Sequence, residues 1–430
     1  MIRSLLLPFV FLSVLFAESA IVSSIPLPKT YVLNLDPYDC DDRCLHELIA
    51  HEQVFSFLAQ MPEAVDDPAL NEQRLIYVSL FNLDSGEQGR GVRIAMLLPE
   101  KVIGRYAVST TNSALAYLLG KNRSFELKTF QTGDESAEAL REGINRIAAE
   151  GFGYVIAPLT KKGANTLASM PLQAKVFFPT VNARDVNTSS EQLFFGGINY
   201  QAQITMLMRE AEPPLIIFYD ESALGESLKE MSRTAFLLNY MDSDPQHFLD
   251  IEKQIHAYPV GKHTTNLKSR LYENEKIRRG TFILNTPLVK SGMIMSQLTL
   301  YDVNASRILS TQINYDPLLF DITQPRDREN MIIANSIGEQ NSVLVEANQL
   351  LQNDILFDWI NYATTLGVDY FYHLGAKTPR EYDIPVRNNQ IRYPIRLYRP
   401  DGSRFELYFD PQAETAETPE DSAFEQSPQP

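Results

Sequence analysis

From Val92 onward the sequence alternates short apolar runs with amphipathic stretches. The first runs, at residues 92–99, 125–131 and 154–158, have the length and content of strands in a largely buried sheet. Between the last two, residues 134–150 carry apolar side chains at helical spacing. Strands that alternate with helices predict βαβ units, a parallel sheet and helices on both faces of it.

The alternation continues to the end of the folded region. Further strands are expected at 215–219, 282–284 and 296–300, and a long helix at 347–366. One sheet does not comfortably hold so many strands, so we expect an α/β fold with two doubly wound lobes and a short N-terminal α/β segment. A (β/α)8 barrel is the competing architecture. The antiparallel hairpin at 387–409, with an Asp-Gly turn, argues against a barrel.

These patterns divide the chain into four segments. We expect a signal peptide at 1–19, an N-terminal segment with one helix at 20–91, the two lobes at 92–409 and a disordered tail at 410–430. The first lobe is expected to contain 92–199 and 317–366. The second lobe is expected to contain 200–316 and the terminal hairpin 387–409.

The N-terminus has the features of an export signal. Arg3 precedes an apolar run from Leu5 to Phe16, and small residues follow between Ala17 and Ala20. The run is too short to span a membrane, and no later apolar run reaches about 18 residues. A buried N-terminal helix or an uncleaved anchor is the alternative. No cysteine ends the run, so we expect a periplasmic protein with neither a lipid anchor nor membrane insertion.

Charge limits the choice of partners. The chain has 38 basic and 54 acidic residues, a net charge of −16. It therefore lacks the basic surface that binding to nucleic acid requires, and no nucleic-acid partner is expected. Residues 410–430 contain six acidic residues and neither Lys nor Arg, which predicts disorder.

Cys40 and Cys44 are the only cysteines. In an exported protein such a pair favours a disulfide, which at this spacing clips a local turn. Two free thiols are the alternative. A zinc site that also uses His46 and His51 is a second alternative. Because two histidines five residues apart on a helix point about 140° apart, we expect no metal site.

The sequence carries no motif for catalysis or for a nucleotide. Residues 99–104, after the first strand, lack the glycines of the dinucleotide fingerprint, and Lys162-Gly163 lacks those of a P-loop. A nucleophile elbow is also missing. We therefore expect neither an enzyme nor a cofactor.

Polar residues follow several of the expected strands. Ligands of open α/β sheets bind outside the carboxyl ends of the strands, so these residues are candidates for a ligand cleft. Each can instead be a turn residue or a helix N-cap. The candidates are Thr160, Asn182, Arg184, Asp220, Glu221, Ser222, Asn285, Thr286, Asn335 and Ser336.

Some of these segments resemble the first lobe of type I periplasmic binding proteins. The matching segments are VRIAMLLP at 92–99 and GFGYVIAPLT at 151–160. In that family the strand that ends in Pro-Leu carries Ser or Thr at the ligand cleft, and the matching residue here is Thr160. A closer resemblance is to the C-terminal domain of LpoA (LppC) proteins, activators of class A penicillin-binding proteins. Segments 193–200, 215–236 and 281–287 carry it, and it covers about residues 92–409.

This resemblance implies a non-enzymatic exported protein that acts by protein–protein contacts in the cell envelope. The alternative is a solute-binding receptor of an ABC transporter, which would hold a small polar metabolite such as an amino acid between its lobes. The expected partner is accordingly an envelope protein or a small polar solute. LpoA proteins also have a lipobox cysteine and a long helical-repeat domain. This sequence has no such cysteine, and only about 70 residues separate the expected signal from the lobes.

Overall fold

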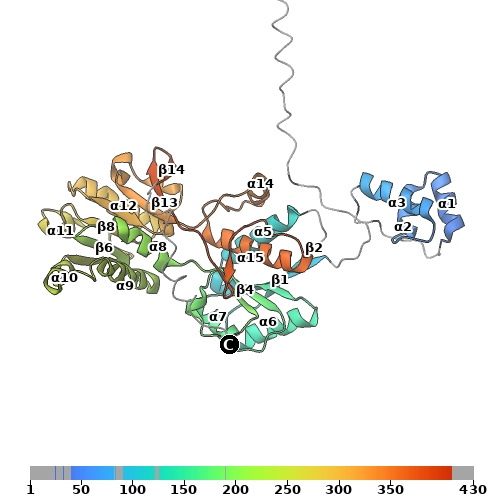
Figure 1. Cartoon of the computed structure of the whole chain (residues 1–430), viewed down its shortest axis with the longest axis horizontal. Coiled ribbons are helices and arrows are strands. Elements are labelled where there is room, and N and C mark those ends of the chain that lie inside the picture. The colour runs from blue at the N-terminus through green and yellow to red at the C-terminus, as the bar shows by residue number, and fades with distance from the viewer. Residues whose placement is uncertain are drawn as a thin grey trace, which may run out of the picture.

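The computed structural model describes Ile25, Val32, Leu83 and residues 40–81, 91–121, 125–188 and 190–408. The expected signal peptide and acidic tail lie outside these residues. The described part contains an N-terminal helical module and two α/β lobes (Figure 1). No helix in it is long and apolar enough to cross a membrane.

The N-terminal module contains three helices, α1 (Asp42–Ala50), α2 (Val54–Gln60) and α3 (Pro68–Leu80). The expectation of one helix is therefore wrong. Glu52 has a positive φ of 57°, which ends the first helix and separates it from the second. Asp41 and Asp67 cap α1 and α3 with their side chains. The module has its own small core, formed chiefly by Leu45, Phe57, Met61, Leu70 and Val78.

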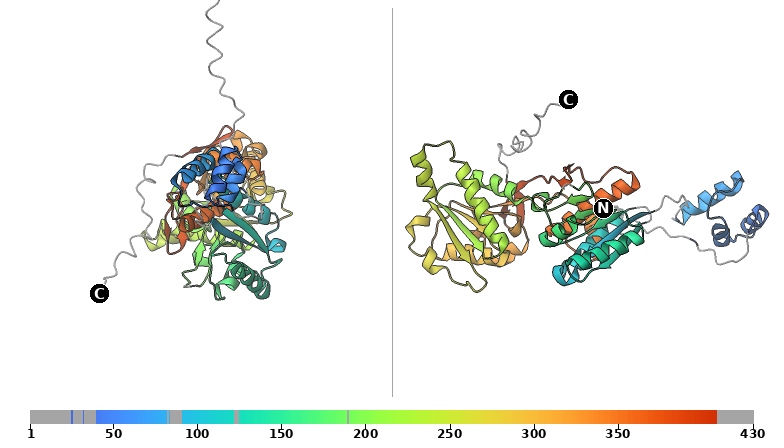
Figure 2. Two further views of the ribbon diagram at one scale, coloured as in Figure 1. Left: turned by 90° about the vertical axis from the view of Figure 1, so that its right-hand side faces the viewer. Right: turned by 90° about the horizontal axis from the view of Figure 1, so that it is seen from below.

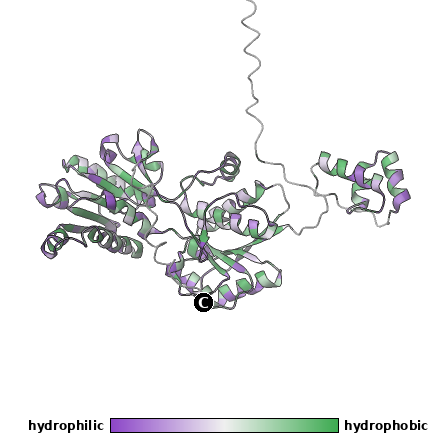
Figure 3. Ribbon diagram, viewed as in Figure 1, coloured by the Kyte–Doolittle hydropathy of each residue, from purple (hydrophilic) through white to green (hydrophobic). Residues whose placement is uncertain are grey.

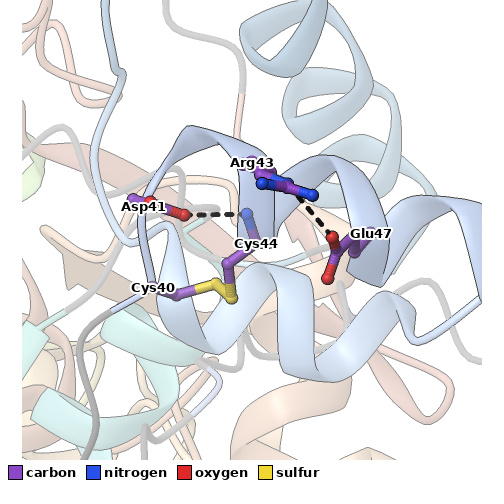
Figure 4. Close-up of a disulfide and its surroundings, with 5 residues drawn as sticks. All are labelled: Cys40, Asp41, Arg43, Cys44 and Glu47. Carbon is purple, nitrogen blue, oxygen red and sulfur yellow. Dashed lines mark hydrogen bonds and ion pairs between the residues drawn. A yellow bond between two sulfur atoms is a disulfide. The ribbon is translucent and has the colours of Figure 1, made fainter.

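A disulfide joins Cys40 to Cys44 at the start of α1 (Figure 4). Beside it, Asp41 accepts a hydrogen bond of 2.9 Å from the backbone N–H of Cys44. His46, a possible zinc ligand by sequence, has its Nε2 atom 2.8 Å from a carboxylate oxygen of Asp67. Within the described residues, no three His, Cys, Asp or Glu side chains gather so as to hold a metal ion.

The first lobe has a seven-stranded sheet in the order β11-β12-β5-β4-β3-β1-β2. Its strands are β1 (Val92–Leu98), β2 (Phe125–Gln131), β3 (Tyr154–Ile156), β4 (Lys175–Phe178), β5 (Leu193–Phe195), β11 (Val386–Arg387) and β12 (Gln390–Ile391). Alternation along β1 divides the core between the two faces. Ile94 and Met96 belong to one cluster, whereas Ala95 and Leu97 belong to the other.

Helices cover both faces of this sheet (Figure 1). One face packs against α5 (Tyr106–Leu119), α14 (Ser342–Leu350) and α15 (Trp359–Ala376). The other packs against α6 (Ala137–Ala149) and α7 (Lys161–Ala168). The short helix α4 (Glu100–Ile103) follows β1. The expected long helix at 347–366 is in fact two helices, α14 and α15, with residues 351–358 between them.

The second lobe repeats this plan with the strand order β14-β13-β10-β9-β8-β6-β7. Its strands are β6 (Leu215–Asp220), β7 (Ile255–Val260), β8 (Thr281–Asn285), β9 (Arg307–Ser310), β10 (Met331–Asn335), β13 (Arg396–Asp401) and β14 (Arg404–Leu407). One face packs against α8 (Tyr200–Leu207), α9 (Ala223–Leu238) and α10 (Pro245–Glu252). The other packs against α11 (Lys268–Leu271), α12 (Leu288–Leu300) and α13 (Leu318–Ile322).

The two lobes confirm the predicted fold class (Figure 2). Hydrophobic residues are concentrated in the strands, and the outer helices are mixed in character (Figure 3). In the described part of the N-terminal segment the regular elements are all helices, with a single bridge residue at Leu83.

The chain crosses between the lobes three times, after β5, after β10 and after β12. These crossings correct one expected boundary. Residues 317–335 belong to the second lobe, because β10 pairs in parallel with β9 and α13 packs against α12. The terminal hairpin is formed by β13 and β14, and β13 pairs with β10 in the second sheet. Gln390, by contrast, pairs with Phe195 in the first sheet.

Candidate ligand-binding cleft

A cavity of about 760 Å³ is lined by residues of both lobes. Its lining includes residues that follow the carboxyl ends of strands in both sheets. Thr180 and Ile198 follow β4 and β5, whereas Leu224, Pro287 and Gln312 follow β6, β8 and β9. This is the edge at which open α/β sheets bind ligands, and the volume falls within the roughly 300–1,000 Å³ of small-molecule sites.

Aromatic side chains form much of the cavity wall. Tyr106, Phe357 and Trp359 come from the first lobe, and Tyr200 and Tyr315 come from the second. The rings of Tyr315 and Phe357 lie 5.5 Å apart, so an aromatic contact connects the two lobes beside the cavity. Burial raises the pKa of both Tyr200 and Tyr315 to about 12, and their hydroxyls therefore stay neutral at physiological pH.

The charged residues of the lining are mostly acidic. They are four aspartates, Asp185, Asp316, Asp354 and Asp358, and one arginine, Arg105. Asp185 is paired with Lys161 at 2.6 Å, outside the lining.

Asp358 is the N-cap of α15 and accepts hydrogen bonds from the N–H groups of Ile360 and Asn361, at 2.9 and 3.2 Å. Burial raises the pKa of this carboxyl group, and the nearby charge of Asp354 raises it further. The two cap hydrogen bonds and Arg105 act in the opposite direction.

Gln312 contributes a buried amide to the lining; the residue is only 6% exposed. Its Oε1 atom accepts from the N–H of Ser336 at 2.9 Å and from Nε2 of Gln203 at 3.1 Å. These two donors fix the orientation of the amide. Its Nε2 donor has no hydrogen-bond partner among the described residues.

Asn182 is the one predicted cleft residue that lines this cavity. It caps the short 3-10 turn Ala183–Asp185, where its Oδ1 atom accepts from the N–H of Arg184 at 3.1 Å. Its amide donates to the carbonyl of Gly197 at 3.2 Å. Arg184 itself is exposed and lies outside the lining.

Thr160 lies outside the cavity lining, and its polar atoms bond to other groups of the first lobe. It caps α7, and its backbone N–H donates to Glu135 at 2.6 Å. The second carboxylate oxygen of Glu135 accepts from the Thr160 hydroxyl. A Cβ at Gly163 would lie 2.4 Å from Glu135 Cδ, so this approach requires a glycine.

The second-lobe candidates also have internal roles. Ser222 caps α9 and donates to Asp220 at 2.6 Å, and Glu221 is exposed beside them. The amide of Asn285 donates to Ser232, and Thr286 pairs with Ser291. The remaining two, Asn335 and Ser336, are buried, with bonds to Ile337 and to Gln203 and Gln312 respectively.

Several cavity residues could not be predicted as such, because they lie in an interval predicted to be helical. Residues 353–359, NDILFDW, supply Asp354, Phe357, Asp358 and Trp359, yet the interval 347–366 was predicted to be helical throughout. The two aspartates that act as turn and cap acceptors are the signal that could have placed a break here.

The sequence matches no protein-family model and no curated protein. Its structure resembles a Rhodospirillum rubrum protein described as a branched-chain amino acid ABC transporter, with a TM-score of 0.56, 11% identity and coverage of 74% of this chain and 100% of the other. The chain has the type I periplasmic binding protein fold.

Two further solved structures share this fold. The leucine-binding protein LivK of Thermotoga maritima gives a TM-score of 0.51 at 11% identity, over 75% of this chain and 99% of LivK. Full-length LpoA of Haemophilus influenzae gives 0.51 at 10% identity, over 83% of this chain and 68% of LpoA. Identities this low establish the fold alone. Both transporter receptors and LpoA have it, so the predicted resemblance to these two groups is confirmed at the level of fold.

Proposed function

We propose that this chain is an exported, non-enzymatic binding protein whose two lobes hold a small polar solute between them. The observation that carries the proposal is the cavity of about 760 Å³, to which both lobes contribute. Three crossings connect the lobes, an arrangement that suits a hinge. A ligand that contacts both lobes would favour their closed arrangement over an open one.

Native mass spectrometry of the protein purified gently from its own periplasm tests the proposal. We expect a small adduct that is lost on denaturation. The identified compound should stabilise the apoprotein by about 2.7 kcal/mol at 100 times its dissociation constant. Absence of an adduct, together with no stabilisation by any member of a polar metabolite panel, would contradict solute binding.

Two variants locate the binding. Asn182→Ala removes a side chain that lines the cavity and should weaken binding, whereas Asp220→Ala, outside the lining, should retain it. Because Asn182 also caps a 3-10 turn, the matched control is Asn274→Ala, which removes the equivalent cap from the distant turn Glu275–Ile277. Retained binding in Asn182→Ala with loss in Asp220→Ala would place the ligand elsewhere.

A second candidate function is a protein-contact role in the envelope, as LpoA has. The Haemophilus LpoA C-domain is described as a regulator of PBP1A. One observation favours this role: residues 92–430 make up about 79% of the chain, so a match that covers 83% of it with full-length LpoA must include some of the N-terminal segment. The helical module also exposes Phe55, Ile76 and Leu80 to solvent, at 58%, 49% and 70%.

Site-specific photo-crosslinking distinguishes this role. A crosslinker at Leu80 should give one discrete adduct with an envelope protein in cells, and a crosslinker at the exposed Glu72 of the same helix is the control. The protein-contact role predicts an adduct at Leu80 whether or not a solute occupies the cavity. Equal, diffuse labelling at both positions would speak against it.

A further inference from the structure

We infer that the inter-lobe cavity selects a small organic cation, an ammonium or guanidinium group on an apolar stem with a nearby hydrogen-bond acceptor. This inference rests on the proposed solute-binding function and names the class of its ligand. It stands on the charges, the aromatic rings and one unpartnered amide of the cavity lining.

Charge is the first argument. With Asp185 paired to Lys161, the lining retains Asp316, Asp354 and Asp358 against the single Arg105. In each of these three aspartates the Oδ1 atom accepts a local backbone N–H. An anionic solute would therefore meet like charge, whereas a cation would add the positive charge that the site lacks.

The lack of positive charge in the cavity lining is clearest at Asp358. This residue is held at the partly buried start of α15, next to Asp354, and burial outweighs the cap hydrogen bonds and Arg105 in raising its pKa. A carboxylate in this position gains most from a cation brought into the cavity, because both groups are then removed from water as a pair.

The aromatic residues provide the second argument. Tyr106, Tyr200, Tyr315, Phe357 and Trp359 all line the same space. Ring faces attract ammonium and guanidinium groups and also pack against an alkyl stem. Carboxylates combined with aromatic rings thus favour a cation that carries an apolar body over a small inorganic cation.

Gln312 provides the third, independent argument. Its Nε2 donor is buried beside the cavity and has no partner within the described part of the chain. An unsatisfied buried donor is costly, so a ligand that brings an acceptor oxygen to it gains affinity. A basic amino-acid residue with amide carbonyls has all the required features.

Three probes of one size test the inference: the N-acetyl amides of lysine, norleucine and glutamate. They share two amide carbonyls and differ in carrying a cationic, an apolar or an anionic side chain. Trp359 is the only tryptophan of the chain and lines the cavity, so its fluorescence reports binding. We expect the lysine probe to bind at least about tenfold more tightly than either of the others.

Asp358→Asn and Asp354→Asn should each reduce the affinity for the lysine probe by about tenfold. Asparagine keeps the local backbone acceptor, so both variants should fold, which their melting temperatures verify. Asp244→Asn is the matched control. Asp244 caps α10 through the same two-donor pattern and lies outside the cavity, so its variant should bind as the wild type does.

Three results would overturn the inference: equal affinity for the three probes, tighter binding of the glutamate probe, or no binding of the lysine probe up to about 10 mM. Native mass spectrometry separates this failure from failure of the proposed function. A neutral or anionic adduct would leave solute binding intact while refuting the cationic class. Absence of any adduct, together with no response to the probes, would refute both.

Discussion

The carboxylate of Glu135 accepts hydrogen bonds from both the backbone N–H and the hydroxyl of Thr160. Thr160 is the residue that the resemblance to type I binding proteins predicts at the ligand cleft. Glu135 is 8% exposed, and its approach is possible because residue 163 is a glycine. In this chain an internal carboxylate therefore occupies the start of α7. A solute must be recognised by other groups, and the aromatic and acidic lining of the cavity supplies them.

Thr160→Ala should destabilise the first lobe by about 1–3 kcal/mol, because it removes a helix cap and a hydrogen bond to a largely buried carboxylate. Thr160→Ser keeps the hydroxyl and should therefore lose much less stability than Thr160→Ala. Ser136→Ala is the control: it removes the exposed cap of α6, whose carboxylate partner Asp134 is exposed rather than buried, and should cost less. Urea denaturation measures the differences. A Thr160→Ala variant that folds normally yet no longer binds solute would return Thr160 to the ligand site.

Asp369 connects α15 with α5 and with the segment that follows α15. Its fully buried carboxylate accepts from Tyr117 Oη, Arg380 Nε and the N–H of Glu381, at 2.8, 2.9 and 3.0 Å. Asp369→Ala should cost about 3–5 kcal/mol, since it leaves the largely buried Arg380 without its counterion. Tyr117→Phe should cost about 1–2 kcal/mol. The exposed ion pair of Glu275 with Arg278 is the control, and Glu275→Ala should cost at most about 1 kcal/mol. Similar losses in Asp369→Ala and Glu275→Ala would contradict this ranking.

The Cys40–Cys44 disulfide should stabilise the helical module alone. A bridge that closes so short a loop contributes about 2 kcal/mol in the chain-entropy account. In the double variant Cys40→Ser/Cys44→Ser, hydrogen exchange should therefore accelerate in α1 to α3 and stay unchanged in the two sheets. A change of exchange in β1 or β6 of similar size would show that the module is coupled to the lobes.

The fold could be predicted from sequence largely because its buried strands are short apolar runs. Residues 92–98 and 215–219 were recognisable in this way, and both lie inside their sheets. Strand β7 was missed: it lies at the edge of the second sheet, contains Pro259 and includes several half-buried residues. Residues 296–300 were expected to form a strand but complete α12, where Ile294, Met295 and Leu298 recur at helical spacing and face the core.

The cavity was less predictable because its residues are brought together by tertiary structure. The carboxyl ends of the strands were the right place to look, as Asn182 and the neighbours Leu224 and Pro287 show. The residue type at the end of a strand did not reveal whether the side chain lines the cavity or caps the helix that follows, as Ser222 caps α9. The contribution of residues 353–359 depends on the return of the chain to the first lobe after β10, which no local pattern encodes.

Asp358→Asn should make the ligand-free protein more stable at pH 7 while weakening its binding of a cation. The pKa of Asp358 is raised in the folded state, so the folded protein holds this proton more tightly than the unfolded chain does. The resulting stabilisation is fully present below the unfolded pKa, near 3.9, and is lost as the pH rises through the folded pKa.

Asparagine keeps the cap of α15 without the charge. The variant should therefore melt a few degrees above the wild type at pH 7, and this gain should shrink as the pH falls towards about 4. Asp244→Asn, which changes an exposed helix cap outside the cavity, is the control. Thermal melts of the three proteins across this pH range provide the measurement. A gain that is constant with pH would mean that the charge of Asp358 is not what costs stability.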